Sequence, residues 1–126
     1  MTNIWGLFMS NNNRLIQLDI NLLDGYAQSL GSHIVKQMFA LYEQQVVIYL
    51  KDIEDSLCCD DIQLWQECCH KMKGAAGSVG LKALHRRLKK MENTNASKDD
   101  KAQQLVDLNA HNKQAMAEFT HWLASL

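Results

Sequence analysis

Residues 61–79 read DIQLWQECCHKMKGAAGSV, and their apolar side chains recur at helical spacing. On a helix that turns by about 100° per residue, these positions fall together as one stripe. The stripe consists of Trp65, Cys68, Met72, Ala75, Ala76 and Val79. His70 lies roughly opposite it. We therefore predict an amphipathic helix that buries the stripe and turns His70 outward.

The surroundings of His70 are bare for a helix surface. Gln66 and Gly74 lie one turn away on either side, Gly77 lies two turns on, and Lys73 lies at the edge of the same patch. Each interior glycine costs about 1 kcal/mol relative to alanine, so helix stability does not explain them. Without their side chains another protein could come flat against the imidazole, and Lys73 offers a flexible cation to an anionic group. The pattern favours a nitrogen nucleophile that carries a phosphoryl group.

Two helices are predicted before this segment. Asp19 is a plausible N-cap for a short helix that Gly31 ends. Ser32 then caps a predicted helix of about 25 residues. Its apolar stripe consists of Val35, Met38, Phe39, Tyr42, Val46, Tyr49, Ile53 and Leu57.

The predicted boundaries of the later helices follow from capping residues. Asp60 with Gln63 forms a capping box for the histidine helix, and Gly80 supplies its exit. A short helix follows over about residues 82–93, and Ser97 with Asp100 opens a last helix that runs to about residue 123. The predicted inward positions of these two helices are Leu84, Leu88, Met91, Leu105, Leu108, Ala115, Met116, Phe119 and Leu123.

Four amphipathic helices joined by short loops predict the fold class. We expect an all-α protein, an antiparallel up-down four-helix bundle with an additional short N-terminal helix. The 126 residues contain no proline and suit one domain. We place this domain at residues 18–126, and residues 1–17 form a linker or extension before it.

Charge is unevenly distributed although the net charge is only -1. Seven basic residues and no acidic residue lie between positions 71 and 90. This cluster is either a solvated helix face or a docking surface for an acidic partner. If it is a docking surface, Arg86, Arg87 and Lys90 are its candidates on the helix after His70.

Composition argues against several other classes of protein. The four cysteines form the vicinal pairs 58–59 and 68–69, which suit neither a disulfide framework nor zinc-site spacing, so we predict no metal site. Reduced thiols and the lack of a secretory signal favour a cytoplasmic protein. No stretch approaches the roughly 20 apolar residues that span a bilayer, so we expect no membrane contact. The three tryptophans are better explained by packing than by nucleic-acid binding.

The residues around His70 resemble a known signature. His70-x-x-Lys73-Gly74, followed by Gly80, is similar to the motif of histidine-containing phosphotransfer (HPt) domains in multistep two-component phosphorelays. The chain upstream also resembles the beginning of these domains, at Leu18-Asp19, Leu22, Leu30-Gly31, Phe39 and Tyr42. The resemblance covers roughly residues 18–126.

The resemblance implies a phosphorelay intermediate. His70 would accept a phosphoryl group from the aspartyl-phosphate of one receiver domain and pass it to another, and Lys73 would stabilise the phosphate. The receiver would dock over Gln66, Gly74 and Gly77 and would contribute Mg²⁺, while this chain needs no cofactor of its own. A monomer is expected. Many members carry a glutamine on the following helix where this chain has Glu92, and the role of Glu92 stays open.

The chain shows no nucleotide-binding signature, so we expect no ATP-dependent kinase activity in it. The extra residues at the N-terminus favour the C-terminal domain of a hybrid sensor histidine kinase over a free-standing relay protein. Two alternatives remain: a non-catalytic helical interaction bundle, and a metal-binding bundle that uses the cysteines and His70.

Overall fold

The computed structural model describes residues 17–126, so the predicted extension lies outside the described residues except for Gln17. The described part contains five helices and no strand. They are α2 (Ile20–Leu30), α3 (Ser32–Cys58), α4 (Ile62–Ser78), α5 (Lys82–Glu92) and α6 (Lys98–Ala124). The predicted all-α class is confirmed.

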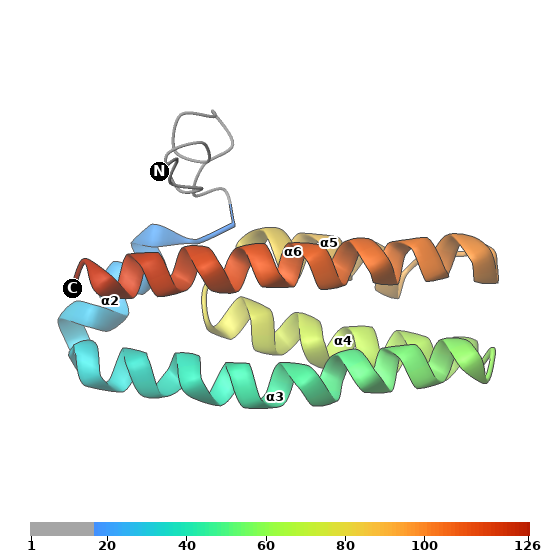
Figure 1. Cartoon of the computed structure of the whole chain (residues 1–126), viewed down its shortest axis with the longest axis horizontal. Coiled ribbons are helices and arrows are strands. Elements are labelled where there is room, and N and C mark those ends of the chain that lie inside the picture. Colours follow the sequence, from blue (N-terminus) through green and yellow to red (C-terminus); the bar gives the residue numbers. More distant parts are fainter. Residues whose placement is uncertain (1–16) are drawn as a thin grey trace, which may run out of the picture.

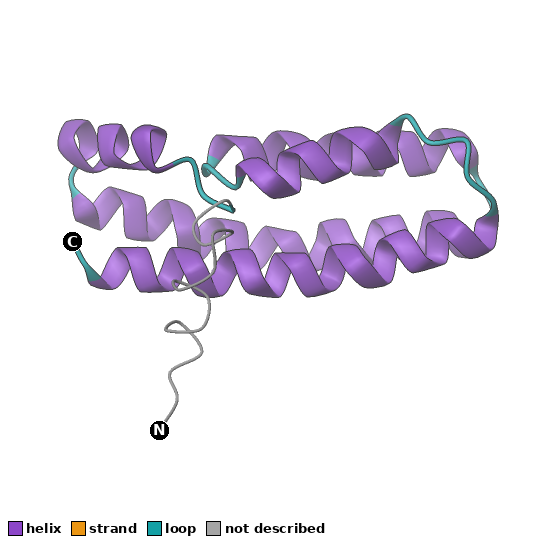
Figure 2. Cartoon of the chain, turned by 90° about the horizontal axis from the view of Figure 1, so that it is seen from above, coloured by secondary structure: helices purple, strands orange, loops and turns teal. Residues whose placement is uncertain are grey.

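Four of the helices form an antiparallel bundle in which the chain runs alternately up and down (Figure 1). Packing contacts join α3 to α4, α4 to α5, α5 to α6 and α6 back to α3. Since α4 and α5 are shorter than their partners, α2 lies beyond their ends and packs on α3 (Figure 2). This is the predicted four-helix bundle with one additional short helix.

The core contains the apolar stripes that the sequence predicted. Trp65 and Met72 of α4 are buried at 1% and 0% exposure. Phe119 of α6 stacks on Phe39 of α3, with 4.4 Å between ring centroids. Burial of aromatic and aliphatic side chains on all four helices supplies the main stabilising term of the fold. The outward face of α4, which carries His70, does not take part in the core.

Two predicted helix starts differ from the structure by one residue. Asp61, not Asp60, is the N-cap of α4, and its carboxylate accepts a hydrogen bond from the Leu64 amide at 3.0 Å. Asp60 instead forms the turn, with a positive φ of 53°. Ser32 does not cap α3 either: it is the first helical residue, and Gly31 is the N-cap without a side-chain bond.

The other predicted caps are confirmed. The Asp19 side chain accepts from the Leu22 amide at 3.1 Å, and the Ser97 hydroxyl accepts from the Asp100 amide at 3.2 Å. Gly80 follows α4 with a φ of +76°. A β-carbon at Gly80 would also lie only 3.0 Å from Leu23, so glycine is needed at this turn.

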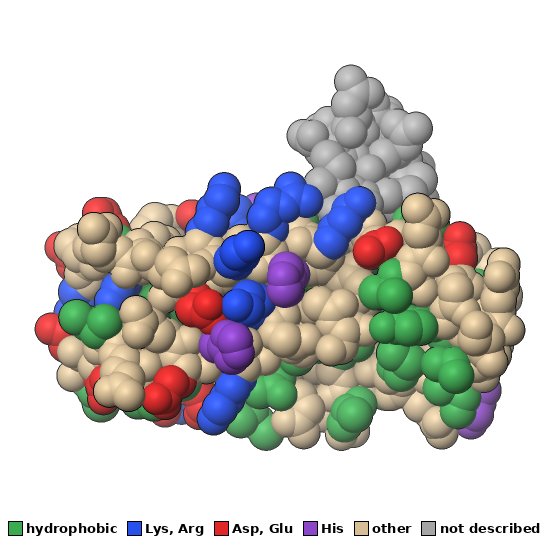
Figure 3. Space-filling model, turned by 180° about the vertical axis from the view of Figure 1, so that it is seen from behind, with side chains coloured by type: hydrophobic (Ala, Val, Ile, Leu, Met, Phe, Trp, Pro, Cys, Tyr) green, Lys and Arg blue, Asp and Glu red, His purple; other side chains and the backbone are tan. Residues whose placement is uncertain are grey.

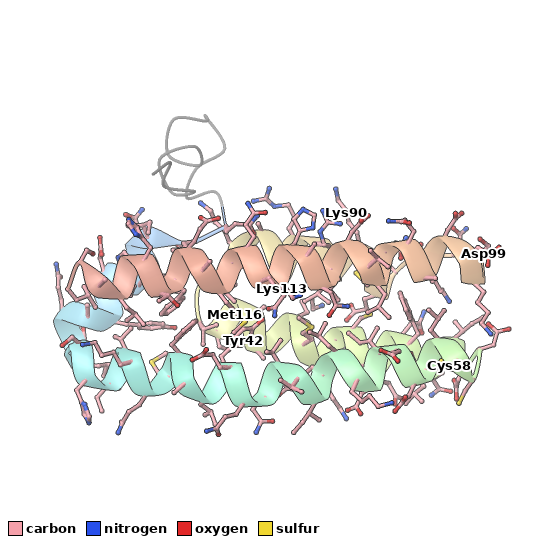
Figure 4. The ribbon with its side chains drawn as sticks, in the orientation of Figure 1. Tyr42, Cys58, Lys90, Asp99, Lys113 and Met116 are labelled. Carbon is pink, nitrogen blue, oxygen red and sulfur yellow. The ribbon has the colours of Figure 1, made fainter. Side chains whose placement is uncertain are left out.

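Buried hydrogen bonds fix the helices against one another. The Trp65 indole donates to the Met91 carbonyl at 2.8 Å and joins α4 to the end of α5. The Tyr42 hydroxyl donates to Asn112 at 2.8 Å and joins α3 to α6; Figure 4 shows Tyr42 and Met116 on the facing sides of these helices. The first bond fixes the α4–α5 pair close to His70.

Within residues 17–126, no helix combines the length and the apolar character that crossing a membrane would require.

Candidate functional site

His70 lies in the middle of α4 on the face opposite the core. Its side chain is 69% exposed, whereas the preceding Cys69 is fully buried. The two neighbours differ because α4 buries one stripe and turns the rest of its surface to solvent. The exposed His70 that the helical pattern predicted is therefore present in the structure.

One nitrogen of His70 is held by α5. Its Nδ1 lies 2.6 Å from Oε1 of Glu92. An ionised carboxylate can only accept a hydrogen bond, so Nδ1 must donate a proton to it. In the neutral imidazole this leaves Nε2 with a lone pair. The contact thus selects the tautomer and turns Nε2 away from Glu92.

Lys73 contacts the same carboxylate. Its Nζ donates to Oε2 of Glu92 at 3.0 Å, and only 17% of its side chain is exposed. Lys73 is therefore not the freely moving surface cation that the sequence suggested. Glu92 uses one oxygen for His70 and the other for Lys73, and so joins two residues of α4 that are one helical turn apart.

The contacts of Glu92 with Lys73 and His70 favour its ionised form. Its side chain is 16% exposed, and this partial burial raises its pKa. The hydrogen bonds from Lys73 and His70 act in the opposite direction and outweigh burial, so the pKa of Glu92 lies below its ordinary value. Glu92 is thus ionised at neutral pH and can hold both partners.

His70 borders a shallow hollow of about 450 Å³. Gln66, Glu67 and Lys71 line it from α4, and Glu92 and Asn93 line it from the end of α5. Of the predicted docking residues, Gln66 therefore shares a surface with His70. The sequence did not single out Asn93, because Asn93 belongs to no motif and merely follows the predicted helix.

The two glycines near His70 occupy different environments. A β-carbon at Gly74 would meet no atom within 4 Å, so the surface above it is open. A β-carbon at Gly77 would lie 2.9 Å from Nδ1 of His85 on α5. His85 in turn donates from Nδ1 to the Lys73 carbonyl at 3.1 Å. Packing of α4 against α5 therefore explains Gly77, whereas Gly74 leaves an open surface on α4.

The basic residues of α5 divide between two surfaces. Figure 3 shows Lys and Arg gathered over α5, above the histidines of the α4–α5 face. Arg86, Arg87 and Lys90 line a groove between α5 and α6 and not the hollow of His70. The structure thus separates these three predicted docking residues from Gln66 and Gly74.

The cysteines do not assemble with His70. Cys58 ends α3 (Figure 4) and Cys59 follows it, and both are exposed, whereas Cys68 and Cys69 are buried. Burial raises the pKa of Cys69 to about 12, so its thiol stays protonated. Among residues 17–126, no group of three His, Cys, Asp or Glu side chains is placed to hold a metal ion.

The fold and the site together define a class of protein: a four-helix bundle that presents one histidine nitrogen to solvent while an acidic side chain holds the other. The chain belongs to the Hpt domain family, whose profile matches residues 37–125. It is thereby a phosphotransfer domain of the two-component signalling type, and the predicted resemblance is confirmed.

Known relatives agree with this assignment. The chain is 37% identical over 67 residues to the aerobic respiration control sensor protein ArcB of Escherichia coli K12 and, equally, to that of Shigella flexneri. A structure of the histidine-containing phosphotransfer domain of ArcB from Escherichia coli superposes with a TM-score of 0.79 and 26% identity, covering 87% of this chain and 95% of that one. A solution structure of the same domain gives a TM-score of 0.75 at 26% identity, with 86% and 88% coverage.

The matched region is 53% of this chain but only 9% of each ArcB sequence. The likeness to the sensor protein is therefore a likeness to one small part of it.

Proposed function

We propose that this chain accepts a phosphoryl group on Nε2 of His70 from the aspartyl-phosphate of one receiver domain and passes it to another receiver. The observation that carries the proposal is that the two ring nitrogens of His70 lie in different environments. Nδ1 is held by Glu92 at 2.6 Å, while the side chain that carries Nε2 is 69% exposed. A nucleophile needs such a free and oriented lone pair.

The transfer step exchanges one bond to phosphorus for another and needs no cofactor in this chain. The Nε2 lone pair forms a bond to phosphorus, and the bond between phosphorus and the aspartyl oxygen breaks in line with it. The receiver carboxylate leaves with that electron pair. The reverse step passes the group to the second receiver. A receiver would contribute Mg²⁺, which would supply positive charge beside the transferring phosphoryl oxygens.

Glu92 supports this step from behind the ring. As Nε2 gives up its lone pair, the imidazole becomes positively charged, and the carboxylate at Nδ1 offsets that charge. Because the phosphoryl group joins the other nitrogen, the ring separates it from Glu92. In this arrangement Glu92 holds His70 without lying at the phosphate.

Lys73 has a second role available. An ammonium group carries three N–H donors, so one can remain on Glu92 while another reaches a phosphoryl oxygen. Lys73 then stabilises the phosphate as a point charge. It positions no nucleophile and takes no proton, so its loss weakens the reaction without abolishing it.

The receiver docks over the hollow of His70, with Gln66 and Gly74 in the contact. Gly74 leaves open space on the side of α4 that faces the partner. We infer that the chain acts as a monomer without nucleic acid or membrane contact, in the cytoplasm. The likeness to a sensor protein supports a parent hybrid histidine kinase, with this chain as a domain that has no ATP-dependent activity of its own.

The experiment is a transfer assay with labelled receivers. Receiver domains phosphorylated on aspartate are mixed with the chain, and label on the chain is followed together with its loss from the receiver. Labelling is expected from a phosphorylated receiver and not from ATP with Mg²⁺ alone. Labelling by ATP alone would indicate a kinase. If no receiver transfers label while the chain still binds receivers, the non-catalytic interaction bundle is the better account.

A further inference from the structure

The groove between α5 and α6 contains a cluster of donors that the phosphotransfer site does not use. Three basic side chains of α5 and His111 of α6 line it, together with Gln17 and Gln104. The hollow measures about 380 Å³. Its basic members are Arg86, Arg87 and Lys90. No acidic side chain lines the groove in the described part of the chain.

These charges are unpaired. Lys51, His70 and Lys73 form ion pairs with acidic side chains, and none of these pairs uses a groove residue. Unpaired cations that converge on one hollow repel one another unless an anion lies between them. All three cations lie on α5, where Arg86 and Lys90 are exposed and Arg87 is half-buried, and α6 forms the opposite wall of the groove.

Arg87 is held in place within the groove. Nδ1 of His111 donates to the Asp107 carbonyl at 2.6 Å, because a carbonyl oxygen can only accept. Nε2 of His111 is then free to accept from Nη2 of Arg87 at 3.3 Å. Arg87 is half-buried, so this contact limits its motion. A guanidinium held in one orientation suits a carboxylate or phosphate oxygen pair.

The two glutamines of the groove favour a peptide carboxylate over a phosphate ion as the ligand. Gln17 is 8% exposed, and its Oε1 is buried without a hydrogen-bond donor among the described residues. Oε1 of Gln104 is buried and equally without a donor in the described part of the chain. Buried amide oxygens need N–H groups. A phosphate ion offers oxygen acceptors, whereas a peptide offers backbone N–H donors alongside its carboxylates.

Residues 1–16 do not contain the carboxylates that would complement the cations of the groove. Residues 1–16 contain no Asp or Glu, and their one charged side chain is Arg14. These residues therefore supply no carboxylate to the groove. We propose that the groove between α5 and α6 binds an acidic peptide segment of a partner protein, at a site separate from His70.

This site is independent of the phosphotransfer reaction. On α5, Glu92 and His85 point toward α4, whereas Arg87 and its groove neighbours line the side toward α6. Figure 4 shows Lys90 on the outer edge of the bundle and Lys113 farther along α6. An acidic segment in the groove can thus tether a partner without covering His70.

The test uses a fluorescein-labelled ten-residue peptide of alternating Asp and Ala, with fluorescence anisotropy as the readout. A matching peptide of alternating Asn and Ala keeps the backbone and removes the charge. The double variant Arg87→Gln with Lys90→Gln removes two groove charges. Lys36→Gln with Lys113→Gln removes two exposed charges outside the groove and is the matched control.

The proposal predicts saturable binding of the acidic peptide that weakens about tenfold or more in the groove variant. The control variant and His70→Gln should bind as the unaltered chain does, and the Asn peptide should not bind. Equal weakening in the groove and control variants would overturn the proposal in favour of general charge attraction. Displacement of the peptide by millimolar inorganic phosphate would overturn it in favour of a small-anion site.

Discussion

At the scale of single residues, Glu92 determines which nitrogen of His70 carries the proton. Its Oε1 accepts from Nδ1 at 2.6 Å, and its Oε2 accepts from Lys73 at 3.0 Å. One carboxylate therefore sets the tautomer of the nucleophile and the position of the nearby cation. Two substitutions separate its hydrogen-bonding role from its charge.

Glu92→Gln keeps an amide oxygen that can accept from Nδ1, whereas Glu92→Ala removes the acceptor. We expect the alanine variant to transfer phosphate about tenfold or more slowly than the unaltered chain, and the glutamine variant to lose less. Single-turnover transfer from a phosphorylated receiver measures both. Equal rates in the two variants and the unaltered chain would remove Glu92 from the reaction.

The lowered pKa of Glu92 also makes stability depend on pH. A carboxyl group whose pKa is lower in the folded state binds protons more readily in the unfolded state. Ionised Glu92 therefore stabilises the fold above its unfolded pKa, about 4.3, and this contribution is lost as the pH falls through the lower folded pKa. Urea unfolding at about pH 6 and about pH 3 should show a larger loss for the unaltered chain than for Glu92→Gln. Parallel losses in both proteins would contradict the assignment.

The helical pattern could predict the outward His70, whereas only the family resemblance pointed to Glu92, and it left the role of Glu92 open. The apolar stripe of α4 alone turns His70 outward, because that stripe depends only on helical spacing. The contact with Glu92 spans 22 positions and depends on how α4 and α5 pack. The contact between Lys73 and Glu92 was missed for the same reason, since nothing local to α4 shows that a carboxylate of α5 lies beside Lys73.

At the scale of helices, α4 packs on α5 at Gly77 and stays open at Gly74. This gives a matched pair of substitutions. Gly74→Ala should stabilise the fold by up to about 1 kcal/mol, because alanine is the better helix former and its β-carbon meets no atom. Gly77→Ala should destabilise it by about 1–3 kcal/mol, because the β-carbon displaces His85 from its bond to Lys73.

Denaturant unfolding measures both changes, and His85→Ala supplies the control. In that background Gly77→Ala should stabilise the fold as Gly74→Ala does, since the obstructing ring is gone. If Gly77→Ala is equally destabilising with and without His85, the packing explanation is wrong.

The N-caps of the helices show which helix boundaries a local sequence pattern can predict. Ser97 and Asp19 were predicted as caps and do cap, because each stands at a plain change from loop to periodic sequence. Asp60 and Asp61 are both competent caps, and the sequence pattern favoured the wrong one. The turn decides between them, since Asp60 adopts a positive φ and leaves Asp61 to accept the Leu64 amide.

At the scale of the whole molecule, charge is distributed over two surfaces of the α4–α5–α6 region. Lys71 lines the hollow of His70 together with the carboxylates of Glu67 and Glu92. Arg86, Arg87 and Lys90 line the separate groove. The sequence showed one run of basic residues and could not divide it, because the division depends on which side of α5 each residue occupies.

Receiver docking should therefore depend on salt. Raising the salt concentration should slow transfer several-fold, because charge attraction is screened over about 10 Å at 0.1 M salt. The second-order transfer rate measures this, and Lys71→Gln should reduce the salt dependence. Lys36→Gln, on the exposed surface of α3, is the control. A rate that does not change with salt would exclude charge steering toward the hollow.

The central claim is that Nε2 of His70 accepts the phosphoryl group while Glu92 keeps the proton on Nδ1. Nuclear magnetic resonance of chain labelled with ¹⁵N-histidine, phosphorylated by a receiver domain, identifies both the residue and the nitrogen that carries phosphorus. We expect phosphorus on Nε2 of His70, and no modification of the His70→Gln variant treated in the same way. Phosphorus on Nδ1, or on any other side chain, would contradict it.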